Sequence, residues 1–143
     1  MARKLTGEEI AREDAFLRGL PRLNIGALFM PPVWGPVHGF WATILYYPAL
    51  LLVDNLIYAA TREPTPLAVI LAVLVSMAVV AVSVVFAIVS QPIAAHRAEA
   101  RGVSRQRYLQ RQRIWAVVSI ALFVVMVGLA TYYNIAFRPL MEG

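Results

Sequence analysis

The sequence predicts an all-α integral membrane protein with three transmembrane helices. Of its 143 residues, 60% are hydrophobic, and three apolar runs occur at about 39–60, 66–90 and 114–133. Each run has about the 20 residues that a helix needs to cross a hydrocarbon core of about 30 Å. A soluble domain of this size has no need of such helices, because they are apolar on every face. We therefore expect residues 1–143 to form a single membrane domain.

The first 24 residues predict a leader that carries an amphipathic surface helix over residues 5–20. Thr6 and Glu9 have the spacing of a capping box, and Gly19 with Pro21 ends the helical pattern. The narrow apolar stripe of this helix suits the membrane surface or a partner. It equally suits one packed edge of a solvated leader.

Residues 25–38 are apolar but too short to span a membrane. Prolines remove backbone donors and disfavour helix at the residue before them, so the segment is expected to be broken. Its tryptophan and histidine suit a membrane interface. We predict an interfacial or re-entrant segment whose backbone polar groups are satisfied by protein or water. Its characteristic residues are Pro31, Pro32, Trp34, Pro36 and His38.

The three predicted spans are joined by short connections. Pro48 is expected to kink the first span near its middle, and Gln91-Pro92 to end the second. A basic loop over residues 91–113 follows, and residues 134–143 form a short tail. Within the loop, Gly102 is expected to break the chain and Ser104 to cap the helix that continues into the third span.

Positive charge predicts the orientation of the spans. The leader holds five cations, and six more lie in the basic loop, whereas the 61–65 connection and the tail hold one each. The positive-inside rule then places the N-terminus in the cytoplasm and the C-terminus outside, in a bacterial inner membrane. The same side chains can contact anionic lipid head groups, and we expect no nucleic-acid partner. They are Arg97, Arg101, Arg105, Arg107, Arg111 and Arg113.

An intramembrane polar cluster is predicted on the first span. Asp54 is an acid inside a span, which is costly and therefore a candidate functional group. Tyr47 and Tyr58 share its helix face, and Asn55 stands beside it. The cluster suits a proton or cation site, or a hydrogen-bond anchor to another subunit. Alternatively, Asp54 is neutral, or it pairs with Arg62 or with a partner chain.

Small side chains recur at helical spacing on the second span and, at one glycine, on the third. Such residues let helix backbones approach closely. The stripe predicts either a contact face for a larger membrane complex or packing within this chain's own bundle. Its members are Ala68, Ala72, Ser76, Ser83, Ala87 and Gly128.

Candidate cofactor ligands are few, and no catalytic motif is present. His38 and His96 fall on the same predicted side of the membrane and would be the ligands of a haem, a pigment or a metal. Histidines at an interface are more often without a ligand, so we expect no metal and no cofactor. The sequence has no cysteine, no H-E-x-x-H and no G-x-S-x-G, and we expect a protein that is not an enzyme.

The stretch N-x-G-A-L-F-x-P-P-x-W-G-P-x-H-G at residues 24–39 resembles the opening of small uncharacterised multi-pass bacterial membrane proteins. The resemblance covers residues 24–60. Ile25 stands where those proteins have an aromatic residue. The resemblance implies that the Pro-Trp-Gly-His segment is a recurring structural device, and it implies no activity.

Three functions are compatible with these features. The first is a non-catalytic accessory or structural subunit that docks on other integral membrane subunits by helix packing. The second is a homo-oligomeric transporter or channel component that uses Asp54. The third is a membrane module that binds lipid or a cofactor.

Overall fold

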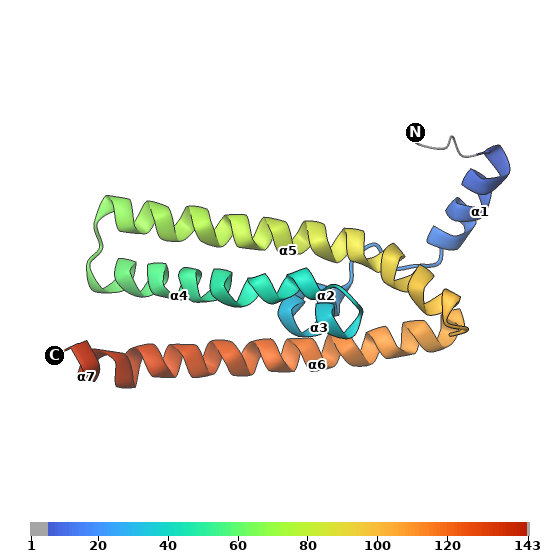
Figure 1. Ribbon diagram of the computed structural model, residues 1–143. Helices are drawn as coiled ribbons and strands as arrows, with labels where there is room; N and C mark the ends of the chain where they lie inside the picture. The colour runs from blue at the N-terminus through green and yellow to red at the C-terminus, as the bar shows by residue number, and fades with distance from the viewer. Residues whose placement is uncertain (1–5, 143) are drawn as a thin grey trace.

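The computed structural model describes residues 6–142, and this part of the chain is all-α, as predicted (Figure 1). Residues 1–5 and 143, which include two cations of the predicted leader, lie outside the described residues. The elements are α1 (Gly7–Leu17), α2 (Ile25–Phe29), α3 (Pro31–Val37), η1 (Trp41–Leu45), α4 (Tyr46–Arg62), α5 (Pro66–Ala100), α6 (Arg105–Tyr132), η2 (Tyr133–Phe137) and α7 (Arg138–Glu142).

Three helical stretches are long and apolar enough to cross a membrane, which confirms the predicted number of spans. They are Trp41–Arg62, Pro66–Ala100 and Arg105–Met141. The second has 35 residues, or about 52 Å of helix, which exceeds a hydrocarbon core of about 30 Å. We call the end of the bundle where α5 ends and α6 begins the basic end, and the opposite end, with the α4–α5 turn, the distal end.

The predicted basic loop over residues 91–113 is wrong in its extent, because most of it is helix. Pro92 lies inside α5, and only Arg101–Ser104 separate α5 from α6. The helix continues past Pro92 because Ala94 and Ala95 are buried in the core, which offsets the lost backbone hydrogen bond. Figure 1 shows the last turns of α5 bending towards α6, as a proline inside a helix favours.

The local breaks beyond Pro92 agree with the sequence. Gly102 has φ 74°, a left-handed conformation that glycine adopts readily, and it ends α5. Ser104 is the N-cap residue of α6 as predicted, although its side chain makes no capping hydrogen bond. The predicted tail, in contrast, is helical: a π-helical turn, η2, continues α6 into α7.

The first span changes its helix type close to Pro48, the residue expected to kink it. The span begins as a 3₁₀ helix, η1, and becomes α-helical at Tyr46. Pro48 therefore lies in the first turn of α4. The N–H of Tyr46 just before it already bonds to the carbonyl oxygens of Thr43 and Ile44 in η1, so Pro48 lies where the 3₁₀ pattern gives way to the α-helix.

The leader helix forms as predicted and packs on the basic end. The N–H of Thr6 donates to Glu9 Oε2 at 2.8 Å, and the N–H of Glu9 donates to Thr6 Oγ1 at 3.3 Å, completing the capping box. Phe16 stacks on the ring of His96 at a centroid distance of 4.1 Å. Part of the apolar stripe is therefore covered by α5 of the same chain.

Residues 25–38 form a helical hairpin, α2–α3, rather than an irregular broken segment. The break falls at Met30, which ends α2 and begins α3, and Pro31 and Pro32 occupy the first turn of α3. Trp34 is 0% exposed and packs inside the protein, and its predicted depth at a membrane interface stays a prediction. Its ring stacks on that of His38 at 3.9 Å.

The hairpin is inserted between α5 and α6. Figure 1 shows α2 and α3 beside the half of α6 nearer the basic end, and α2 packs on both α5 and α6. Its contacts on α6 extend from Gln112, which bonds to Asn24 and Trp34, to Phe123, which meets Phe29 edge-on at 5.4 Å. Phe123 lies eleven positions after Gln112, which corresponds to about 16 Å of helix.

Replacing Gly35 with alanine tests the packing between the hairpin and η1. A Cβ at Gly35 would overlap the side chain of Thr43, whereas a Cβ at Gly128 would meet nothing within 4 Å. We expect Gly35→Ala to lower the free energy of unfolding by about 1–3 kcal/mol, the usual cost of overpacking. Thermal unfolding in detergent measures it, with Gly128→Ala as the control. Equal melting temperatures for the two variants would contradict the packing described here.

Candidate functional site

A buried cluster of polar side chains joins the hairpin to α5 and α6 near the basic end. We call it the polar junction. Its amide members are exposed by 3% at Asn24, 2% at Gln91 and 9% at Gln112. Since buried polar groups are costly unless they are paired, such a cluster has to be an ordered network. Its members are Asn24, Trp34, His38, Gln91, Tyr108 and Gln112.

Asn24 is the N-cap of α2 and the centre of the polar junction. Its Oδ1 accepts from the N–H of Ala27 at 3.0 Å, as an N-cap side chain should. Its backbone N–H donates to the carbonyl oxygen of Ala87 on α5 at 3.1 Å. Its Nδ2 then donates to Gln91 Oε1 at 2.6 Å and to Gln112 Oε1 at 3.1 Å. One side chain thus ties α2 to both long helices.

The capping bond fixes the direction of the remaining hydrogen bonds. Because Asn24 presents its N–H groups, Gln112 must present Oε1, which also accepts from Trp34 Nε1 at 3.2 Å. Gln112 Nε2 then donates to His38 Nε2 at 3.2 Å. His38 Nδ1 lies 2.7 Å from the carbonyl oxygen of Trp34, so Nδ1 carries the proton and the imidazole is neutral.

Burial supports the neutral form of His38, which lies outside the three candidate spans. Desolvation lowers the pKa of His38 below its ordinary value of 6.5, and the nearby charge of Arg101 lowers it further. The hydrogen bond to the Trp34 carbonyl opposes these effects in part.

The side-chain amide of Gln91 has two donors on Nε2, and neither has an acceptor within the described chain. Its Oε1 accepts from Asn24 and lies 3.3 Å from the hydroxyl of Tyr108, which also lies 3.3 Å from the Gln91 carbonyl oxygen. Gln91 lines a cavity of about 410 Å³ that opens beside the polar junction. Asn24 and Gln112 line the same cavity, together with Arg18 and Arg113.

The predicted intramembrane cluster around Asp54 is tied to the far end of the third span. Asp54 Oδ1 accepts from Asn134 Nδ2 at 2.7 Å, and Arg138 lies 3.9 Å from Asp54 Oδ2. Arg138 also donates to Asn55 Oδ1 at 2.8 Å. The cation beside Asp54 is thus Arg138, in the segment predicted as a tail, rather than the predicted Arg62.

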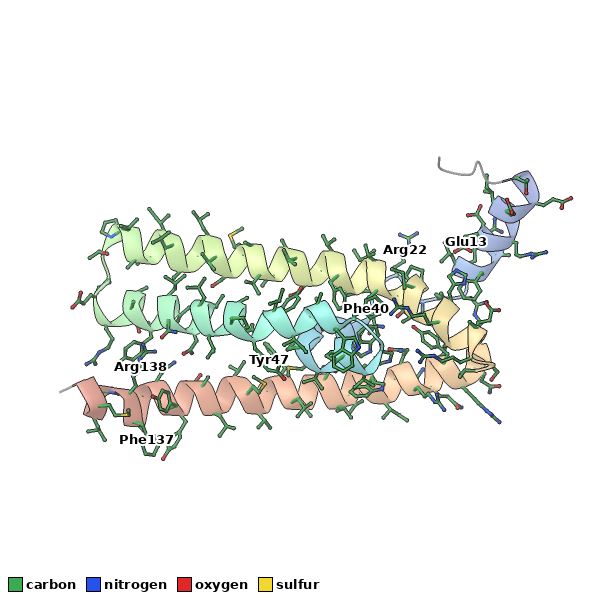
Figure 2. The ribbon with its side chains drawn as sticks, in the orientation of Figure 1. Glu13, Arg22, Phe40, Tyr47, Phe137 and Arg138 are labelled. Carbon is green, nitrogen blue, oxygen red and sulfur yellow. The ribbon has the colours of Figure 1, made fainter. Side chains whose placement is uncertain are left out.

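The aromatic members of the Asp54 cluster differ in role. The Arg138 guanidinium lies 3.7 Å from the ring centroid of Tyr58, which is buried, in a cation–π contact. Figure 2 shows Arg138 between α4 and α6 at the distal end. Tyr47 is 42% exposed, and within residues 6–142 no hydrogen bond joins it to Asp54. The group therefore acts as a clamp between α4 and the end of α6.

The six arginines proposed to contact lipid divide into two sets. Arg97 donates to the His38 carbonyl oxygen at 3.0 Å and covers the ring of Phe40, and Arg105 donates to the carbonyl oxygen of Phe16. These two hold the hairpin and the leader in place. The other four are exposed, and one of them lines the cavity; they are Arg101, Arg107, Arg111 and Arg113.

The small residues of the second span face inwards. Ala72, Ser83 and Ala87 are buried, and Ala68 and Ser76 are half-buried, on a helix that packs on α4 and α2. This stripe therefore serves packing within the chain. Gly128 of α6 is different, because no other group of the described chain lies within 4 Å of its Cβ position.

The two histidines have partners other than a cofactor. Both ring nitrogens of His38 belong to the polar junction. His96 Nε2 lies 2.8 Å from Glu13, and its Nδ1 lies 3.8 Å from Glu99. Within the described chain, no group of three or more His, Cys, Asp or Glu side chains is placed to hold a metal ion.

Fold and junction together define a class: an α-helical membrane protein with three spans and a hairpin held between two of them by buried amides. No family model, no curated protein and no solved structure matches the chain. The resemblance of residues 24–60 to small bacterial membrane proteins stays a prediction.

Replacing Gln112 tests the polar junction. Gln112→Leu would leave the Trp34 N–H and the His38 Nε2 without partners, and each unpaired buried group costs about 1–3 kcal/mol. We expect a lower melting temperature and a changed tryptophan fluorescence. Gln110→Leu, at an exposed position of the same helix, is the matched control. An unchanged melting temperature in Gln112→Leu would contradict a stabilising junction.

The neutral His38 predicts a stability that falls with acid. Below pH 6.5 the unfolded chain binds a proton at His38 that the folded chain resists, because its pKa is lowered. The contribution of His38 to the free energy of unfolding should therefore be fully present above about pH 6.5. It should decrease below that pH, by up to about 1.4 kcal/mol per pH unit. His38→Gln should flatten this dependence, and His96→Gln should leave the His38 contribution in place. Unfolding in detergent between pH 5 and 8 measures it, and an equal pH dependence in wild type and His38→Gln would contradict the assignment.

Proposed function

We propose that this protein is a non-catalytic accessory subunit of a larger integral membrane complex, and that it docks on a helix of another subunit through the outward face of α6. The observation that carries the proposal is the exposure of α6 in its middle. Residues 121–129 are exposed at every position. Within the described chain, the hairpin holds α6 from Gln112 to Phe123, and the clamp at Asp54 holds the segment that continues α6.

The outward face of α6 has the small residues that helix pairs use. Ser119 is fully buried, and Gly128 lies nine residues further, which at about 100° per residue is the opposite side of the helix. Ala121 lies on the same outward side. A glycine without neighbours lets a second helix approach the backbone closely. In lipid alone it would leave a notch in an otherwise bulky surface.

The remaining features support a structural subunit. The Asp54 cluster is engaged by Asn134 and Arg138, which favours an interhelical anchor over a transported ion. We further propose that the hairpin is re-entrant and that the basic end faces the cytoplasm of a bacterium, as the positive-inside rule predicts.

Substitution of Gly128 tests the docking face. Gly128→Leu should abolish stoichiometric co-purification with a distinct membrane subunit in mild detergent, because the added side chain blocks close approach. Met126→Leu, about 200° away around the helix, should leave it intact. Native mass spectrometry of the purified complexes measures the stoichiometry. A protein that purifies only as a homo-oligomer, or a complex unaffected by Gly128→Leu, would contradict the proposal.

A further inference from the structure

The cavity beside the polar junction collects positive charge with no opposing acid among its described lining residues. Arg18 comes from the end of the leader and Arg113 from α6, and Asn24, Gln91 and Gln112 lie between them. We propose that this cavity binds the phosphate group of an anionic glycerophospholipid, with Arg18 and Arg113 as its charged contacts. This site is independent of the docking face of α6.

Both guanidinium groups are free to take a ligand. Within residues 6–142, the side chains of Arg18 and Arg113 make no hydrogen bond, ion pair or ring contact. Arginine presents parallel N–H groups that match two oxygens of a phosphate. The other arginines of the basic end that have internal contacts, Arg97 and Arg105, lie outside this cavity.

The side-chain amide of Gln91 is a second, independent indication that the cavity binds an anion. Gln91 is 2% exposed and lines the cavity, yet its Nε2 lacks an acceptor within the described chain. Because this Nε2 group is not among the fully buried unpaired atoms and Gln91 lines the cavity, it is accessible there and can donate to a ligand or to water. A phosphate oxygen held by the two arginines would be such an acceptor, so charge and hydrogen bonding point to an anion.

The surroundings of the cavity favour a lipid over a free phosphate. Leu20, Leu23, Leu109 and Ala116 also line it, so its wall is partly apolar. From Leu109, positions 113, 116, 120 and 124 follow one side of α6 at helical spacing. Ile120 and Val124 on this side are exposed by 40% and 62%. An acyl chain can therefore lie along α6 while its head group occupies the cavity.

The chain offers a charge-matched control. Arg107 and Arg111 are exposed, lie on the same helix as Arg113 and line neither of the two cavities at the basic end. Replacing this pair removes the same charge as replacing Arg18 and Arg113. A general attraction of the basic end to anionic lipid would be weakened equally by both changes.

The experiment titrates the purified full chain in a neutral detergent with phosphatidylglycerol, phosphatidylcholine or inorganic phosphate, and counts bound molecules by native mass spectrometry. We expect one tightly retained phosphatidylglycerol. Arg18→Gln with Arg113→Gln should weaken its binding at least about tenfold. Arg107→Gln with Arg111→Gln should change it less than about threefold. Adding phosphatidylglycerol should raise the melting temperature of the wild type and of Arg107→Gln with Arg111→Gln, and should raise that of Arg18→Gln with Arg113→Gln much less.

Several results would overturn the proposal. Equal loss in the two double variants would assign binding to the overall charge of the basic end. Equal retention of phosphatidylcholine would remove the role of the anionic head group. Inorganic phosphate that displaces phosphatidylglycerol at similar concentration would identify a site for a free anion.

Gln91→Glu gives a separate readout. The variant keeps carboxylate oxygens for Asn24 and Tyr108 but replaces the unpaired N–H with an acceptor that repels phosphate. It should lose phosphatidylglycerol binding, and its melting temperature in lipid-free detergent shows whether the protein tolerates the buried carboxylate. Undiminished lipid binding in a folded Gln91→Glu would contradict the site. If this variant does not fold, the two arginine pairs still decide the question.

Discussion

Gln112 carries the constraint on which the rest of the structure depends. The hairpin α2–α3 places a short, proline-interrupted backbone between two long apolar helices, where its polar groups must be paired by protein. Gln112 accepts from Asn24 at the start of the hairpin and from Trp34 near its end, and it donates to His38. One amide on α6 thus bonds to residues at the start of α2 and in α3. Because a buried network is stable only when it is complete, α2 and α3 are fixed in one position along α6.

The hairpin also decides the shape of the bundle. It lies between α5 and α6 at the basic end, and towards the distal end the clamp formed by Asp54, Asn134 and Arg138 joins α4 to the end of the third span. Between these two joints, α6 presents apolar side chains on all sides. The two surfaces available for partners, the outward face of α6 and the cavity beside the polar junction, both result from this arrangement. A bundle of three directly packed helices would have neither.

The sequence predicted some residues of the candidate sites and missed others. Asp54 was predicted because an acid in an apolar run is conspicuous by hydropathy alone. Asn24, Gln91 and Gln112 were not predicted as a group, since Asn24 lies 67 residues from Gln91 and 88 from Gln112 in the chain. The available signal was weak: each is an uncharged amide bordering an apolar run. Arg18 and Arg113 were likewise read as parts of two separate charge clusters, and only the fold brings them to one cavity.

By itself, the sequence determined the features that depend on neighbours along the chain. The three spans follow from apolar length, the capping box from Thr6 and Glu9, and the break at Gly102 from its backbone freedom. Tertiary structure decided which polar groups are buried and which partners they find. It carried α5 past Pro92, because burial of the following alanines outweighs one lost backbone bond. It also gave Asp54 a partner in Arg138, because long-range packing brings together residues that no local pattern connects.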